Sequence, residues 1–68
     1  MTKFKINTET IQLSQLIKAL NISQSGGQAK LMIDNGEVKV NGQVEYRKRA
    51  KLSRGDKIEI FDQHIEIE

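Results

Sequence analysis

The sequence predicts an α+β fold in which two helices pack on a short, mostly antiparallel β-sheet, and we expect residues 1–68 to form a single small domain. Three patterns support this fold class. Apolar residues recur with helical spacing between residues 13 and 20, a second helix has start and stop signals near residues 25 and 36, and apolar and polar residues alternate around an Asn-Gly pair. A chain of 68 residues buries only about 60% of the surface that its unfolded form exposes. We therefore expect function on the surface rather than in an enclosed cavity.

The first helix is expected after a short strand over residues 3–7. Thr8 or Thr10 can cap this helix, because a side-chain hydroxyl accepts a hydrogen bond from the free amides of a first turn. Apolar residues at i, i+3, i+4 and i+7 form one stripe that must face a core; they are Leu13, Leu16, Ile17 and Leu20. Asn21 ends the helix, and a short turn over residues 21–24 leads to the next one.

The second helix is expected between Ser25 and Gly36. Ser25 and Gln28 have the spacing of a capping box, and Gly36 is placed to take the left-handed conformation that ends many helices. The buried face consists of Ala29, Met32 and Ile33, with Leu31 at its margin.

A hairpin is expected directly after this helix. Val38 and Val40 alternate with charged residues, and Asn41-Gly42 is typical of a type I′ turn because both central positions of that turn need positive φ. Residues 43–44 begin the return strand. Residues 46–54 are too polar and cationic to be buried, so we expect them to form an extended or irregular surface segment.

A second hairpin is expected to complete the sheet. A turn at residues 54–56 leads into a strand over residues 57–61, and a turn at Asp62-Gln63 leads into a last strand over residues 64–67. Every second residue of these strands is apolar, so one face packs inward; it consists of Ile58, Ile60, Ile65 and Ile67.

The composition argues against an enzyme. The chain has no cysteine, one histidine and no tryptophan, and no nucleophile–base pair or metal-ligand spacing is visible. We therefore expect no cofactor, no metal and no small-molecule substrate. We expect no signal peptide, because no long apolar run follows the first residues, and there is no run of about 20 apolar residues. We therefore expect a soluble, cytoplasmic protein that does not contact membranes. The short polar sheet edges suggest a monomer.

The segment Arg47-Lys48-Arg49-Ala50-Lys51 is the main candidate for function. Adjacent cations repel one another, and an array of phosphates would relieve that repulsion and release counterions. Arginine can also bind phosphate with two parallel hydrogen bonds. Lys48 joins this surface only if the segment is irregular, because a regular strand would turn it to the opposite face. The alternative is a merely solvated loop.

Nearby residues have two interpretations each. Tyr46 could stack on an unpaired base, but a half-buried ring that anchors the strand end is the favoured interpretation. Gly26 and Gly27 either let a phosphate approach the start of the second helix or allow close packing against the first. Lys30 could reach the same anion, or it could pair with Asp34 one turn later.

These residues and motifs resemble a known family. The runs 25–30, 36–42 and 47–49 are similar to the alpha-L RNA-binding domain first recognised in ribosomal small-subunit protein S4, and most of all to its small stand-alone bacterial members of the YaaA and YbcJ type. In that family the second helix and the following hairpin contact RNA. The resemblance therefore implies an RNA-binding surface made of Gly26, Gly27, Gln28, Lys30, Lys39, Asn41 and Gly42, extended by Arg47, Lys48, Arg49 and Lys51. The wider family often has an arginine where Gly26 stands, so one contact is lost or is replaced by backbone amides.

The leading hypothesis is a non-enzymatic protein that binds structured RNA, with ribosomal RNA as the expected target, through phosphates and shape. The alternative is a protein-interaction adaptor. Residues 58–68 carry four carboxylates and no lysine or arginine, so this acidic hairpin could dock a basic ribosomal protein, or its edge strand could pair with a partner.

Overall fold

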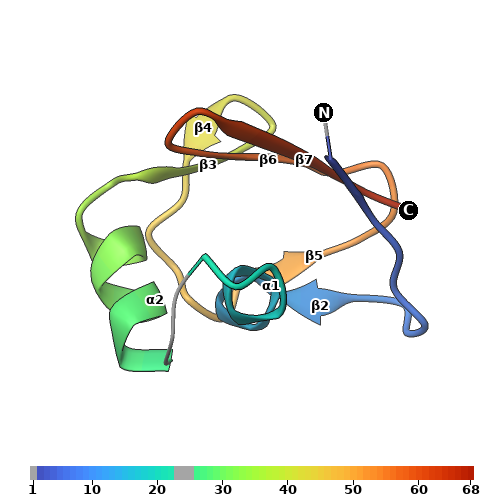
Figure 1. Cartoon of the computed structure of the whole chain (residues 1–68), viewed down its shortest axis with the longest axis horizontal. Coiled ribbons are helices and arrows are strands. Elements are labelled where there is room, and N and C mark those ends of the chain that lie inside the picture. The colour runs from blue at the N-terminus through green and yellow to red at the C-terminus, as the bar shows by residue number, and fades with distance from the viewer. Residues whose placement is uncertain (1, 23–25) are drawn as a thin grey trace.

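The computed structural model describes residues 2–22 and 26–68, which form two layers (Figure 1). One layer is a five-stranded sheet with the strand order β1-β7-β6-β3-β4. Its strands are β1 (Thr2–Phe4), β3 (Val38–Val40), β4 (Gln43–Val44), β6 (Lys57–Ile60) and β7 (Gln63–Ile67). The other layer holds helices α1 (Leu13–Ala19) and α2 (Gly26–Asp34) and a ribbon of two strands, β2 (Ile11–Gln12) and β5 (Lys51–Leu52).

The predicted fold class is confirmed, with one addition to the topology. Strand β1 runs parallel to β7, whereas the other strand pairs of the described chain are antiparallel. The first strand was expected over residues 3–7, but β1 is shorter and begins one residue earlier. Ile6 lies in the loop after β1, and its side chain is part of the core.

The core lies between the two layers and includes the predicted apolar stripes. Leu13, Leu16 and Ile17 of α1 are fully buried, as are Ala29 and Ile33 of α2, whereas Leu31 is 61% exposed. Ile58, Ile60, Ile65 and Ile67 of the last hairpin are each at most 1% exposed. Alternate strand residues point to opposite faces, so the charged residues between these isoleucines lie on the outer face of the sheet.

The start of α1 differs from the prediction. Neither Thr8 nor Thr10 caps it; the Thr8 hydroxyl donates to the Thr10 carbonyl instead (2.6 Å), and the helix begins at Leu13 after Gln12. The amides of Leu13 and Ser14 donate to the carbonyls of Ala50 (2.9 Å) and Lys48 (3.0 Å). Free amides of a first helical turn need acceptors, and here a distant segment supplies two of them.

The end of α2 is as predicted. Gly36 has φ +75°, its amide donates to Ile33 O (3.1 Å), and the amide of Glu37 donates to Met32 O (3.1 Å). This pair of bonds defines a Schellman motif, in which glycine is favoured because it has no Cβ to clash at positive φ. The predicted capping box at the other end depends on Ser25, which lies outside the described residues, as do residues 23–24 of the predicted turn over residues 21–24.

Two predictions about the remaining segments are wrong. Residues 46–54 are not all at the surface: Ala50 is 8% and Leu52 is 1% exposed, because β5 pairs with β2 and turns Leu52 into the core. The turn of the second hairpin is Phe61-Asp62 rather than Asp62-Gln63, since Ile60 and Gln63 are paired. The first hairpin is confirmed, with Asn41 and Gly42 both at positive φ (51° and 86°).

No helix in residues 2–22 and 26–68 is long and apolar enough to cross a membrane.

Candidate nucleic-acid interface

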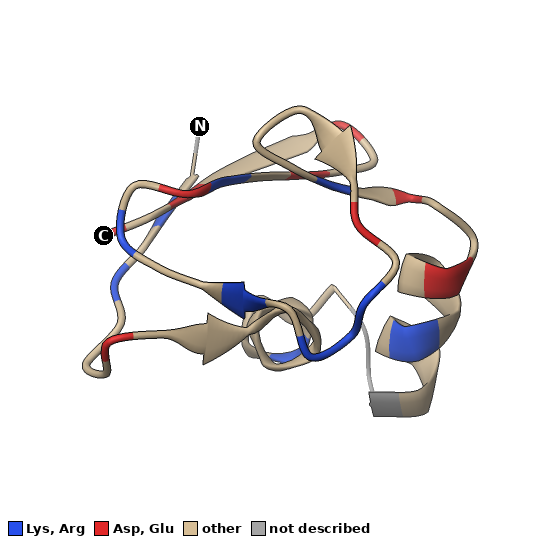
Figure 2. Ribbon diagram, turned by 180° about the vertical axis from the view of Figure 1, so that it is seen from behind, with Lys and Arg blue, Asp and Glu red and all other residues tan. Residues whose placement is uncertain are grey.

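Residues 47–51, here called the basic turn, connect the sheet layer to the helix layer. The Ala50 amide donates to the Arg47 carbonyl (3.1 Å), so Lys48 and Arg49 form the tip of a tight turn. The segment is thus irregular and not a regular strand. This was the condition under which Lys48 could lie on the same surface as its neighbouring cations. Figure 2 shows it as a blue stretch that descends beside α2 toward the layer of α1, whereas blue and red alternate along the sheet.

The backbone of the basic turn is fixed to α1. The carbonyls of Lys48 and Ala50 accept the first amides of that helix, and the Ala50 side chain is buried. Both carbonyls therefore point into the protein, and the long side chains of Lys48 and Arg49 are left at the surface. A cation presented from an anchored backbone has less conformational freedom to lose on binding than one on a free loop.

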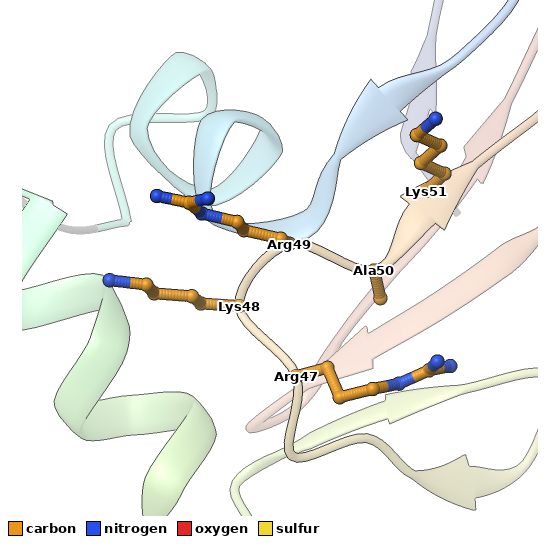
Figure 3. A pocket seen from close by; sticks show the side chains of 5 residues that line it. All are labelled: Arg47, Lys48, Arg49, Ala50 and Lys51. Carbon is orange, nitrogen blue, oxygen red and sulfur yellow. The ribbon is translucent and has the colours of Figure 1, made fainter.

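The side chains of the basic turn diverge around a shallow hollow of about 680 Å³. Figure 3 shows Lys48 and Arg49 extending to one side of the turn, Arg47 to the other side, and Lys51 away from both. In the part of the chain that the structure describes, Lys48, Arg49 and Lys51 form no ion pair. These three positive charges are therefore available to an anionic ligand.

Arg47 is held differently from its neighbours, by a residue that the sequence reasoning missed. Its Nε and Nη2 donate to Glu45 Oε2 and Oε1, both at 3.1 Å, and its backbone amide donates to Glu45 Oε2 at 3.2 Å. Hydrogen bonds and the charge of Arg47 lower the pKa of the Glu45 carboxyl, and the same contacts raise the pKa of the Arg47 guanidinium. The Glu-x-Arg spacing was the available signal, because residues i and i+2 of an extended chain share a side.

The first turn of α2 contains three of the predicted residues, Gly26, Gly27 and Gln28. Gly27 and Gln28 are exposed. Lys30 donates to Asp34 Oδ2 at 2.8 Å, with about half of each side chain exposed (52% and 46%). In this structure Lys30 therefore forms the predicted ion pair with Asp34 one turn later in the helix.

Asn41 is engaged within the protein. Its Oδ1 accepts from the Lys57 amide (2.9 Å) and its Nδ2 donates to Asp56 Oδ1 (3.1 Å), while its own amide donates to the Lys57 carbonyl (2.7 Å). Asp56 in turn accepts from the Ser53 amide (2.8 Å). This network joins the tip of the first hairpin to the turn before β6. The space around Gly42 is open, because no atom lies within 4 Å of the position that a Cβ on this residue would take.

Lys39 lies on the outer face of the sheet, because Val38 before it is buried. There it lines a small hollow of about 250 Å³ together with Glu37, Glu59 and Phe61. Its surroundings are therefore acidic, in contrast to those of Lys48 and Arg49.

Tyr46 is 62% exposed, more than the favoured half-buried interpretation implied. A Cβ placed on Gly36 would lie 3.4 Å from the Tyr46 hydroxyl oxygen and 3.6 Å from its Cε1. One edge of the ring therefore rests on the end of α2, and most of the ring stays accessible beside the basic turn.

The acidic residues of the last hairpin do not form an acidic face. Strand register places Glu66 between Lys3 and Lys57, and Glu59 between Lys39 and His64. The sheet thus interleaves charges of both signs that the sequence keeps apart. This arrangement weakens the alternative of a basic protein docking on an acidic hairpin. Among the described residues, no group of three or more histidine, cysteine, aspartate or glutamate side chains could hold a metal ion.

Comparison with known proteins places the chain in a family. The S4 domain family matches residues 4–68, and the chain belongs to it. The chain is 39% identical over 57 residues to YbcJ of Escherichia coli, covering 84% of this chain and 81% of that protein. It is 44% identical over 55 residues to RlbA of Bacillus subtilis, named a probable ribosome maturation protein, covering 81% of this chain and 78% of that protein.

Solved structures show the same fold. The solution structure of Escherichia coli YbcJ, described as revealing an alpha-L motif involved in RNA-binding, has a TM-score of 0.74 at 35% identity and covers 98% of this chain and 86% of that one. The 30S ribosomal protein S4e of Thermoplasma acidophilum has a TM-score of 0.70 at 27% identity. The match covers 85% of this chain but only 31% of S4e.

Proposed function

We propose that this protein is a non-enzymatic module that binds structured RNA through phosphate contacts at the basic turn. The observation that carries the proposal is the anchored turn whose Lys48, Arg49 and Lys51 project without an acidic partner among the described residues. Each phosphate that these cations neutralise releases condensed counterions, which supplies affinity without reading the base sequence.

The relatives favour RNA over duplex DNA as the ligand. The structure of YbcJ is described as containing a motif involved in RNA-binding. RlbA is named for ribosome maturation and S4e is a ribosomal protein, so ribosomal RNA is the proposed target. A-form RNA displays its phosphates and 2′-hydroxyls along a wide minor groove, which suits recognition by shape and charge.

The proposed surface extends from the basic turn to the start of α2. Gly27 and Gln28 are exposed there, and Figure 3 shows Lys48 extending toward α2. Lys30 can join this surface if a phosphate displaces Asp34, an exchange of one exposed ion pair that costs about 0.2–1 kcal/mol. The proposed surface excludes Asn41, which the hairpin network uses, and Lys39, which lies on the outer face among carboxylates.

The test is binding to ribosomal RNA fragments and to matched duplex DNA, measured by fluorescence anisotropy over a series of salt concentrations. The variant Lys48→Gln/Arg49→Gln/Lys51→Gln removes three exposed charges from the turn. The control Lys3→Gln/Lys5→Gln/Lys57→Gln removes three exposed charges elsewhere. We expect the first triple variant to lose most of the RNA affinity and the control to lose little. If both triple variants lost the same amount of RNA affinity, binding would be explained by non-specific attraction to the net positive charge.

A further inference from the structure

Glu45 and Arg47 form a bidentate ion pair at the edge of the proposed interface. Two parallel hydrogen bonds of 3.1 Å join the guanidinium to the carboxylate, and a third of 3.2 Å joins the same carboxylate to the Arg47 backbone amide. The Glu45 side chain is only 19% exposed, whereas the Arg47 side chain is 79% exposed. The less exposed partner therefore orients an accessible guanidinium.

This arrangement leaves one edge of the guanidinium free to donate. Arginine has five N–H groups in a planar fork, and Glu45 takes those on the Nε and Nη2 side. The remaining donors on Nη1 and Nη2 point away from Glu45 and form a second fork. Such a fork matches two neighbouring acceptors in one plane, which occur on a phosphate and on the O6 and N7 atoms of guanine.

The charge of Glu45 distinguishes these two ligands. The carboxylate already compensates the charge of Arg47, so a phosphate at the free edge would approach a neutral pair with an anion beside it. The O6 and N7 atoms of guanine carry no net charge and need only directed donors. The fixed orientation given by Glu45 favours such a directed contact.

We propose that Arg47, held by Glu45, reads the O6 and N7 edge of a guanine that is unpaired in the bound RNA. The proposal rests on the proposed function, because Lys48, Arg49 and Lys51 must first hold the neighbouring phosphates. The guanine must be unpaired, since the deep, narrow major groove of A-form RNA keeps that edge out of reach of side chains. Tyr46, between the two paired residues, is 62% exposed and supplies a ring on which the unpaired base can stack.

The test uses hairpin RNAs that share one stem and differ at one nucleotide of a uridine loop, which is guanosine, adenosine, cytidine, uridine or 7-deazaguanosine. Binding is measured by fluorescence anisotropy for the wild type, Arg47→Lys, Glu45→Gln and Lys51→Gln. We expect the wild type to prefer guanosine about tenfold, as one bidentate contact allows, and to lose that preference for 7-deazaguanosine, which lacks N7.

The variants separate base reading from phosphate binding. Arg47→Lys keeps the charge and should remove the guanosine preference with little change in salt dependence. Glu45→Gln should reduce the preference while all RNAs bind more tightly, since an uncompensated arginine attracts phosphate. Lys51→Gln should weaken binding to every loop by the same factor.

Two results overturn the inference while the proposed function stands: equal affinity for all five loops in a wild type that Lys51→Gln still weakens, or a guanosine preference that survives both Arg47→Lys and Glu45→Gln. Absence of binding to any of the hairpins and to ribosomal RNA fragments would instead refute the proposed function.

Discussion

Replacing Asn41 tests whether this residue serves the fold or the ligand. The family resemblance implies an RNA contact, but in the structure the Asn41 side chain bonds to the Lys57 amide (2.9 Å) and to Asp56 Oδ1 (3.1 Å). We expect Asn41→Ala and Asn41→Gly to destabilise the protein and to leave RNA affinity unchanged wherever the variants are folded.

The magnitude follows from the two hydrogen bonds and the backbone. An average intramolecular hydrogen bond contributes about 1 kcal/mol, so the loss of two costs about 1–2 kcal/mol at this exposed site. Asn41 also has φ +51°, a conformation that costs alanine a further ~1 kcal/mol but costs glycine almost nothing. We therefore expect a loss of about 2–3 kcal/mol for Asn41→Ala and about 1–2 kcal/mol for Asn41→Gly.

Urea denaturation followed by circular dichroism measures both losses. A stability of about 0.05–0.15 kcal/mol per residue gives a chain of this length only a few kcal/mol, so the titrations are done in the cold. Unfolding midpoints within experimental error of the wild type would refute the structural role. If the Asn41→Gly variant were fully folded and still bound RNA more weakly, Asn41 would have to contact the RNA.

Three further changes test other features of the fold. Gly36→Ala should lower the free energy of unfolding by about 1–2 kcal/mol, because Gly36 has φ +75°, a conformation in which a Cβ is strained; urea midpoints check this. Phe61→Asn should raise the thermal midpoint, since Phe61 has φ +54° and is 57% exposed, and asparagine tolerates this backbone conformation better; an unchanged or lower midpoint would speak against strain at this turn. The lowered pKa of Glu45 predicts that its pair with Arg47 contributes stability above about pH 4.5, the ordinary pKa of glutamate, and that this stability is lost as the pH falls through the lower pKa of the folded state. Urea midpoints of the wild type and Glu45→Gln should therefore converge toward acid pH, and a constant difference would contradict the pairing.

Local sequence patterns predicted the parts of the fold that depend on local chemistry. The α1 stripe, the Gly36 helix end and the Asn41-Gly42 turn follow from spacing and from which residues tolerate positive φ. The start of α1 depends instead on carbonyls of Lys48 and Ala50, which lie far away in the sequence. No pattern near Thr8 or Thr10 signals such a partner, so the local capping rule chose the wrong residues.

The sequence predicted where the candidate site lies, but only part of the hydrogen bonds and ion pairs that its residues form. The cluster of cations from Arg47 to Lys51 is visible in the sequence, and the structure gathers it in one turn. Sequence alone did not show that Glu45 binds Arg47, that Asn41 is engaged by Asp56 and Lys57, or that register interleaves Glu59 and Glu66 with lysines. The Asn41 contacts and the strand register depend on tertiary geometry, whereas the Glu45–Arg47 pair is local and had a signal in the Glu-x-Arg spacing.

The salt dependence of RNA binding tests the central claim most directly. If Lys48, Arg49 and Lys51 each neutralise a phosphate, replacing all three by glutamine should reduce the slope of log K against log salt by about two to three. The control at Lys3, Lys5 and Lys57 should leave the slope close to that of the wild type. An unchanged slope in the first variant, or an equal reduction in both, would contradict RNA binding through the basic turn.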